Sequence, residues 1–229
     1  MAAPHLDIVI PVLGAPPGLA ATLEALEEGR AAGLLGEVLL VSGDGDPALL
    51  QRFGEAARVI TAPSGRGQQL AAGAEACGSD WLLFLHADTR LAPGWAAEAA
   101  DFMAWTPELE RAAAFRLAFD ATHFAAKAIA VIANWRSRWL GLPYGDQGLL
   151  IARDFYERLG GFRPLVLMED VDLARRIGRR RLTLLRGRAI TSAARYRRDG
   201  WWLRPLRNLS ILALYFLGVP PATLRRLYG

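Results

Sequence analysis

Short apolar runs alternate with helix-patterned segments through the first 88 residues of the chain. The apolar runs have the length and composition of strands buried on both faces; they are residues 6–13, 37–42, 57–62 and 80–88. The helical patterns between them are residues 16–33, 47–57 and 68–78. Strands that are apolar on both faces and separated by helices predict a parallel sheet covered on both sides. We therefore expect an α/β fold with a Rossmann-like, mostly parallel central sheet.

The rhythm changes from residue 111 onward. The pattern there predicts a strand, a long helix, another strand and two shorter helices, at residues 111–120, 121–141, 146–152, 153–162 and 168–180. The last thirty residues are apolar, aromatic and basic at once, and we expect helices in them. Because no repeat, low-complexity linker or clear break appears, we expect one domain over residues 1–229, with halves at 1–110 and 111–195 and a C-terminal helical segment at 196–229.

Composition favours a protein with a substantial core. Hydrophobic residues make up 52% and charged residues 22% of the chain, and the mean hydropathy is +0.17, which excludes a disordered or collagen-like chain. A single cysteine, Cys77, excludes an internal disulfide. The first apolar run lacks a preceding Lys or Arg, and no apolar run reaches the roughly 20 residues of a membrane span, so we expect a cytoplasmic location.

The net charge of +4 hides a strong asymmetry. Residues 175–229 hold 14 arginines and one acid, whereas residues 1–174 hold 13 basic and 22 acidic residues. Such a basic end suits an anionic partner, either a phosphorylated substrate or an acidic membrane surface. Since no nucleic-acid-binding motif accompanies the arginines, we expect no nucleic-acid partner.

Asp88 is the first candidate for chemistry. Ligands of an open parallel sheet bind beyond the carboxyl ends of its strands, and Asp88 follows a predicted central strand. A carboxylate there suits a divalent cation, because Mg²⁺ typically takes one or two carboxylates and completes its shell with water and phosphate oxygens. The alternative is that Asp88 caps a turn or the helix near Pro93. For His86, a strand-end hydrogen bond and a place in the site remain equally open.

The acidic pair Glu169 and Asp170 is the second candidate. An apolar run at 165–168 precedes the pair, which favours a partly desolvated carboxylate at Asp170 that is suited to proton abstraction. The alternative is that both acids only complement the dipole of the helix that they open.

Two glycine-flanked segments add polar candidates. In residues 144–148, Asp146 and Gln147 offer groups suited to sugar hydroxyls, although a plain turn explains the segment equally well. In residues 64–69, backbone N–H groups and Arg66 at a helix start are suited to an anion.

Together these motifs resemble family 2 glycosyltransferases with the GT-A fold. The resemblance rests on their order and spacing over nearly the whole chain: VIPVLG, EVLLVSGDGDP, GRGQQLAAGA, WLLFLHADT, GLPYGDQGLLI, GGF, MEDVDLARR and ARYRRDGW. HADT, GDQ and MED together are most similar to the subgroup associated with radical-SAM or selenodomain proteins, the arsenosugar biosynthesis type.

The resemblance implies an inverting hexosyl transfer from a nucleotide-diphosphate donor to an acceptor hydroxyl, with Mg²⁺ or Mn²⁺ as cofactor. On that basis residues 1–110 form the nucleotide-sugar-binding half and residues 111–195 the acceptor half. Asp170 takes the place of the general base with Glu169 in support, and Asp88 with His86 takes the metal position. The donor-binding residues implied are Pro11, Ser42, Asp44, Arg66, Gln69, His86 and Asp88. The acceptor-binding residues implied are Asp146, Gln147, Arg198 and Trp201.

This chain departs from the family pattern at several positions. Ser42 stands where the family has an Asp after its second strand, and His86 stands at the first acidic position of the D-x-D motif. These departures motivate an alternative, a non-catalytic nucleotide- or sugar-binding relative. A nucleotidyltransferase is a third hypothesis, but its Gly-rich signature loop is not found after the first strand.

The C-terminal segment allows two further interpretations. Its aromatic and basic residues can border a lipid-linked or phosphorylated acceptor, with the apolar stretch 210–219 in a membrane interface. Alternatively, this stretch packs on the domain with the arginines as a solvated rim. We expect the second arrangement, because residues 210–219 are apolar on all sides.

Overall fold

The computed structural model describes residues 5–105 and 110–228 of the chain. Within them the strands form one eight-stranded sheet of order β3-β2-β1-β4-β7-β6-β8-β5. Their bounds are β1 Leu6–Val12, β2 Leu35–Ser42, β3 Arg58–Thr61, β4 Trp81–Phe84, β5 Thr89–Leu91, β6 Ala112–Phe119, β7 Leu149–Ala152 and β8 Leu182–Thr191. The core follows this sheet, since β1 and β4 are buried almost throughout.

The direction of the strands changes across the middle of the sheet. β3, β2, β1 and β4 are parallel neighbours, as the alternating pattern of the first 88 residues predicts. β7 then runs antiparallel to both β4 and β6, while β6 and β8 are parallel and β5 is antiparallel to β8. Four of the seven pairings are therefore parallel, and the predicted α/β class with a mostly parallel sheet is confirmed.

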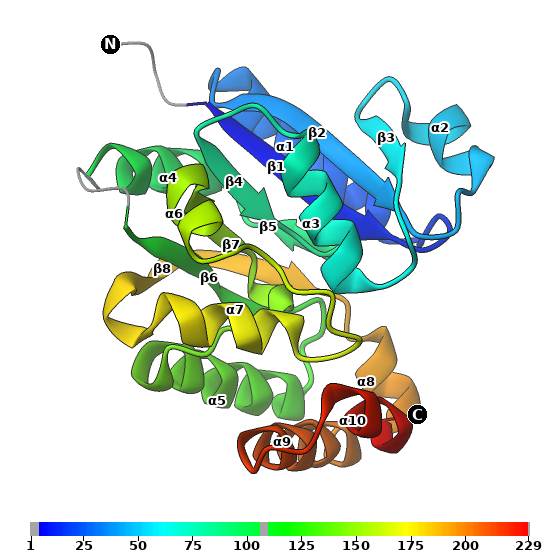
Figure 1. Ribbon diagram of the computed structural model, residues 1–229, viewed down its shortest axis with the longest axis vertical. Helices are drawn as coiled ribbons and strands as arrows, with labels where there is room; N and C mark the ends of the chain where they lie inside the picture. Colours follow the sequence, from blue (N-terminus) through cyan, green and yellow to red (C-terminus); the bar gives the residue numbers. More distant parts are fainter. Residues whose placement is uncertain (1–4, 106–109, 229) are drawn as a thin grey trace.

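Helices cover both faces of this sheet. Their bounds are α1 Leu19–Ala31, α2 Pro47–Phe53, α3 Arg66–Ala76, α4 Trp95–Ala104, α5 Phe124–Leu140, α6 Arg153–Arg158, α7 Glu169–Ile177, α8 Ala194–Asp199, α9 Leu203–Phe216 and α10 Pro221–Tyr228. In Figure 1, α3 and α7 pass in front of the sheet and α1 lies behind it. The last three helices gather with α5 at the bottom of the same view.

The structure corrects three predicted elements. Two strands are absent from the sequence-based prediction: β8, because residues 182–191 were left without an element, and the short β5 at Thr89–Leu91. The strand predicted at 146–152 is a 3₁₀ turn, Gly145–Gln147, followed by β7. The third correction concerns residues 210–219, of which only one face is buried: Ile211 and Leu212 pack in the core, whereas Phe216 and Leu217 are exposed.

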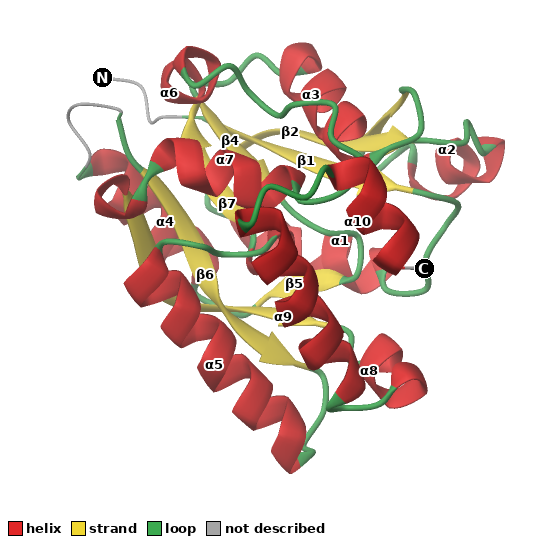
Figure 2. Cartoon of the chain, turned by 60° about the horizontal axis from the view of Figure 1, so that its bottom comes forward, coloured by secondary structure: helices red, strands yellow, loops and turns green. Residues whose placement is uncertain are grey.

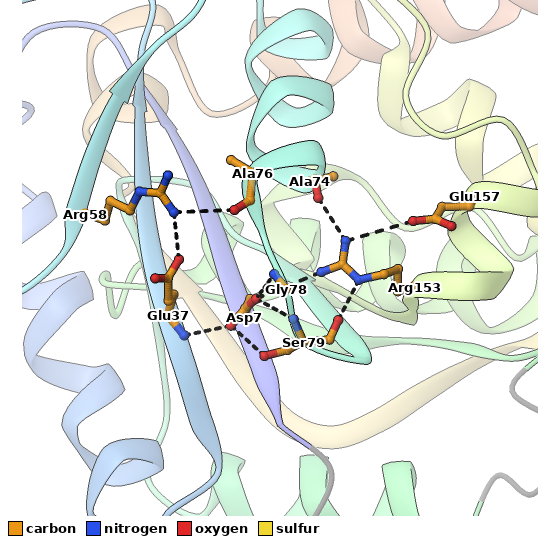
Figure 3. A network of polar contacts seen from close by, with 9 residues as sticks. All are labelled: Asp7, Glu37, Arg58, Ala74, Ala76, Gly78, Ser79, Arg153 and Glu157. Atoms are coloured by element: carbon orange, nitrogen blue, oxygen red, sulfur yellow. Dashed lines mark hydrogen bonds and ion pairs between the residues drawn. The ribbon is translucent and has the colours of Figure 1, made fainter.

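A buried carboxylate fixes the amino-terminal ends of the central strands. Asp7 of β1 accepts hydrogen bonds from the backbone N–H groups of Glu37, Gly78 and Ser79 at 2.7–2.8 Å (Figure 3). Burial acts to raise the pKa of Asp7, but these hydrogen bonds hold it below its ordinary value. Asp7 thus joins β1 to β2 and to the turn before β4, at the end of the sheet opposite the cavity described below.

Candidate functional site

A cavity of about 390 Å³ opens where the chain leaves β4. It brings together segments from the middle and the end of the chain: the loop after β4, the turn before β7, the start of α7, the end of β8 and helices α8 to α10. Asp88 and Asp170 both line it, from different elements. The two carboxylates on which the sequence-based mechanism depends therefore face one space.

The start of α7 holds Asp170 in a defined orientation. Its Oδ2 atom accepts a hydrogen bond from the backbone N–H of Gly145 at 2.9 Å, and its Oδ1 atom accepts one from Val171 N–H at 2.7 Å. Met168, immediately before the helix, has φ 68° and ψ 22°, a left-handed conformation that costs a methionine about 1–3 kcal/mol. Among the described residues it is the only non-glycine with positive φ, and it lies at the cavity wall.

Glu169 lies deeper than Asp170 and pairs with Arg66. Its side chain is almost fully buried, and its Oε1 atom lies 3.4 Å from Arg66 Nη1. Burial first, and then the neighbouring Asp170 charge, raise the pKa of Glu169, while Arg66 counteracts them. Burial acts to lower the pKa of Arg66, but the carboxylates around it raise it overall, so the guanidinium stays charged. Arg66 thus brings a fixed positive charge to the cavity wall.

Asp88 and His86 both line the cavity, but their polar atoms have different surroundings. The Asp88 carboxylate makes no hydrogen bond to any other group in the part of the chain that the structure describes. The His86 ring, by contrast, turns its Nε2 atom against Gly145, where it is buried without a hydrogen-bond partner among the described residues. Burial and the charges of Arg66 and Arg195 hold the pKa of His86 well below its ordinary range. His86 therefore lines the cavity beside Asp88 as a neutral imidazole whose Nε2 atom is turned toward Gly145, and its part in holding a cation stays a prediction.

The adjacent residues Asp146 and Gln147 of the turn before β7 have different surroundings. Asp146 lines the cavity, and its Oδ1 atom is buried without a hydrogen-bond partner in the described structure. Burial, opposed by Arg136 and reinforced by the charges of Asp170 and Asp88, raises the pKa of Asp146 to about 6.

Gln147 is fully buried and points away from the cavity. Its Oε1 atom accepts a hydrogen bond from Ser137 Oγ at 2.7 Å, and its Nε2 atom donates to the Phe115 carbonyl at 3.0 Å. The structure therefore gives Gln147 a place in the core instead of the predicted contact with sugar hydroxyls.

The donor residues expected after β1 and β2 form a network of their own and do not line the cavity. Asp44 accepts hydrogen bonds from Ser42 Oγ at 2.8 Å and from Gly14 N–H at 2.7 Å, which hold the pKa of Asp44 below its ordinary value.

Gln69 connects the carboxyl ends of β1 and β2. Its side-chain amide donates hydrogen bonds to the carbonyls of Val12 in β1 and Val41 in β2. Pro11 lies within β1, opposite Val41. These residues shape the carboxyl edge of β1 and β2.

The two predicted acceptor residues of the C-terminal segment also lie outside the cavity lining. Arg198 is exposed and pairs with Asp199 at 2.7 Å. The ring of Trp201 stacks on His123 with 4.9 Å between the centroids and 8° between the planes. Arg198 and Trp201 are therefore not part of the cavity that Asp88 and Asp170 share, and their contact with an acceptor stays a prediction.

Other residues of the C-terminal segment line the cavity. The cavity wall formed by the end of β8 and by α8, α9 and α10 consists of Thr191, Ser192, Arg195, Tyr196, Arg204, Asn208 and Arg225. Arg204 is buried and pairs with Asp199 at 2.6 Å, while Asn208 has a buried Oδ1 atom without a hydrogen-bond partner among the described residues. The excess of arginine after residue 175 predicted a basic surface in this segment. Which arginines line the cavity depends on how helices α8 to α10 pack, and this could not be predicted from the sequence.

The residues present fit a divalent cation with few protein ligands. The described part of the chain contains no group of three or more His, Cys, Asp or Glu side chains placed to hold a metal ion. What it offers is the Asp88 carboxylate, without a partner, and the buried, unpartnered oxygen of Asp146 in the same cavity. Mg²⁺ and Mn²⁺ sites that are completed by phosphate oxygens and water need no more than this.

The family model described as "Glycosyl transferase family 2" matches residues 7–162, about two thirds of the chain. No curated protein sequence gives a significant match.

Solved structures with the GT-A glycosyltransferase fold superpose on the chain. The mannosyltransferase PcManGT from Pyrobaculum calidifontis, in complex with GDP-Man and Mn²⁺, has a TM-score of 0.65 at 16% identity, over 98% of this chain and 68% of its own. Mannosyl-3-phosphoglycerate synthase from Rubrobacter xylanophilus has a TM-score of 0.59 at 14% identity, over 97% and 74%. GalNAc-T7, with UDP, GalNAc and Mn²⁺, has a TM-score of 0.62 at 14% identity, over 83% of this chain and only 44% of its own. At these identities the likeness establishes the fold.

Proposed function

Because the chain belongs to glycosyl transferase family 2, we propose that it transfers a hexose from a nucleotide-diphosphate donor to an acceptor hydroxyl, with inversion at the anomeric carbon. The observation that carries this proposal is that Asp88 and Asp170 line one cavity. Its volume, about 390 Å³, is within the range of small-molecule sites.

Asp170 is the general base in this proposal. As the acceptor oxygen attacks the anomeric carbon, its proton passes to the Asp170 carboxylate, and the bond from that carbon to the donor diphosphate breaks. A single displacement of this kind inverts the anomeric centre. The N–H groups of Gly145 and Val171 fix the carboxylate while it receives the proton.

Asp88, with Asp146 beside it, is the proposed holder of the cation. When bound, Mg²⁺ or Mn²⁺ supplies positive charge to the departing diphosphate. The presence of Mn²⁺ in the PcManGT and GalNAc-T7 structures supports a divalent cation here. Arg66 adds a second positive charge for the donor phosphates, and Glu169 supports the site by holding Arg66 in place.

The acceptor wall is basic. Arg195, Arg204 and Arg225 line the cavity on the side of α8 to α10, which favours an acceptor that carries phosphate, free or lipid-linked. Asp146 is placed to contact a sugar hydroxyl as well as a cation. The HADT, GDQ and MED motifs also support membership of the radical-SAM or selenodomain-associated subgroup.

A second candidate is a relative that binds nucleotide-sugars without turning them over. It is favoured by the buried Nε2 atom of His86 and by the engagement of Ser42 and Asp44 with each other. Both features leave fewer groups for the donor than the family pattern provides.

A thermal-shift screen of nucleotide-sugars, with and without Mg²⁺ or Mn²⁺, tests the proposal, because a ligand bound by the folded state raises its melting temperature. We expect one donor to raise Tm only with the cation and to be consumed when phosphorylated acceptors are added. Asp88→Asn should lose the cation-dependent shift, whereas Asp101→Asn, which changes an exposed carboxylate on α4, should keep it. Donor binding without turnover across an acceptor panel would favour the second candidate, and no donor binding at all would refute both.

A further inference from the structure

α9 exposes leucines on its outer side, although Ile211 and Leu212 of the same helix are buried. Its polar residues Arg204 and Asn208 face the cavity, whereas Leu206 and Leu209 face outward. With Leu217, which directly follows the helix, these leucines are 60–80% exposed. A helix in contact with water on its outer side normally presents charged or polar residues there.

α5 presents a second outward apolar row. Phe124, Val131, Ile132, Trp135 and Trp139 are 50–74% exposed, and their spacing of three, four and seven residues places them on one face of the helix. Both helices lie at the bottom of the molecule in Figure 1, and both come forward when that end is turned toward the viewer in Figure 2. We call these five residues of α5, together with Leu206, Leu209 and Leu217, the apolar end face.

Positive charge surrounds the apolar end face. α5, α9 and α10 contain no Asp or Glu at all. Lys127 and Arg138 on α5 and Arg226 on α10 are exposed. Arg197 and Arg198 on α8 are exposed as well, but they pair with Asp120 at 3.7 Å and with Asp199 at 2.7 Å, so the excess of positive charge comes from α5 and α10. Apolar residues flanked by Lys and Arg, without acids between them, are typical of helices that lie in the interface of an anionic membrane.

From this combination we propose that the apolar end face docks on the surface of an anionic lipid bilayer. Single exposed apolar residues are common, but rows of them on two helices at the same end of the molecule exceed what soluble monomers ordinarily leave in water. A second copy of the chain would cover the leucines but would bring two sets of arginines against each other. No helix of the described residues is long and apolar enough to cross a membrane, so the contact is interfacial.

Docking in this way sets the distance between the bilayer and the cavity. Arg204 and Asn208 reach the cavity from the opposite side of α9, so one helix thickness, about 10 Å, separates the lipid surface from the cavity wall. The docking surface itself contains no residue of the proposed catalytic machinery.

Co-sedimentation of the full chain with vesicles tests this proposal. We expect binding to phosphatidylcholine vesicles that contain phosphatidylglycerol, weaker binding to phosphatidylcholine alone, and release from the mixed vesicles at high salt. The triple variant Leu206→Gln, Leu209→Gln, Leu217→Gln should bind about tenfold more weakly or worse, since these side chains supply the buried apolar area. Circular dichroism and Tm establish that the variant is folded, and Trp135→Gln provides an independent reduction from α5.

The control is Leu50→Gln, which changes a leucine of α2 that is 61% exposed and distant from the apolar end face. It should bind like the parent. Absence of binding to anionic vesicles at low salt overturns the proposal, as does equal binding of the triple variant and the control. A dimer in sedimentation equilibrium that the triple variant abolishes, without any vesicle binding, would assign the face to a second copy and overturn the membrane proposal. Equal binding to neutral and anionic vesicles would overturn the role of the arginines.

Discussion

The backbone N–H of Gly145 donates a hydrogen bond to Asp170 Oδ2 at 2.9 Å, joining two motifs that are 25 residues apart in the chain. If Asp170 is the general base, Asp170→Asn preserves an oxygen for this bond but removes the proton acceptor. We expect turnover to fall by about 10²–10⁴-fold, with donor affinity and Tm close to those of the parent. Initial-rate measurements and donor titration check this, with Asp101→Asn as the control. Parental turnover in the folded variant would remove Asp170 from the mechanism.

Gly145 also tests how closely the site is packed. An added Cβ atom would collide with His86 Nε2, so we expect Gly145→Ala to move the turn away from Asp170 and to destabilise the fold by about 1–3 kcal/mol. Gly78→Ala is the matched control, because an added Cβ there meets no atom within 4 Å. Denaturant unfolding and turnover are the measurements. Equal effects of the two substitutions would contradict the predicted collision.

Asp146 should make stability depend on pH. Its folded-state pKa, raised to about 6 by burial, exceeds the ordinary value of 3.8, so the folded protein holds a proton that the unfolded chain releases. Stability contributed by this group therefore falls as pH rises from about 4 to 6 and stays low above that. In cation-free buffer, Asp146→Asn should be more stable than the parent at pH 7, by up to about 3 kcal/mol, with the difference vanishing below pH 4. Unfolding curves over this pH range decide it; a pH-independent difference would disprove the assignment.

Gln147 is expected to affect stability and not substrate recognition. Gln147→Leu leaves the Phe115 carbonyl without the amide that donates to it, which should cost about 1–3 kcal/mol in the core, whereas Ser137 Oγ keeps its hydrogen bond to the Ala133 carbonyl. The KM for both substrates should stay unchanged at a temperature where the variant is folded. A large rise in acceptor KM, with stability retained, would return Gln147 to the sugar site.

Asp7 provides a stability test far from the cavity. Asp7→Asn replaces an acceptor of several N–H groups by an amide that can accept through one oxygen only, so we expect a loss of about 3 kcal/mol or more at neutral pH. Because its folded-state pKa lies below the ordinary value, the parent loses this contribution as pH falls below about 4. The variant should show a shallower loss of stability in acid. Identical acid unfolding of parent and variant would contradict the prediction.

The strands of the first half of the fold could be predicted from the sequence because each of them is an apolar run of its own. β1, β2 and β4 are buried on both faces in their central residues, which leaves uninterrupted apolar runs in the sequence. β8 escaped prediction for the opposite reason: Arg186 and Arg188 interrupt its apolar pattern, and it gains its place by pairing with β6. β5 has three residues, too few for a periodicity to appear.

At the site, sequence motifs located the loops but not the directions of the side chains. Asp88 and Asp170 were found because each follows or opens an element whose position in the fold is predictable. Gln147 was misplaced because it follows Asp146 by one residue in a 3₁₀ turn, and adjacent residues there point in different directions. Arg204 and Asn208 were missed because polar residues of a helix are expected to face solvent, and only the packing of α9 turns them inward.

The two walls of the cavity come from separate stretches of the chain. Arg66, Asp88 and Asp146 lie within the 7–162 family match, whereas Asp170 and the arginines of α8 to α10 follow it. On the proposed function, substitutions that alter the choice of acceptor would therefore fall in one contiguous stretch, residues 191–225, while the opposite wall is left untouched.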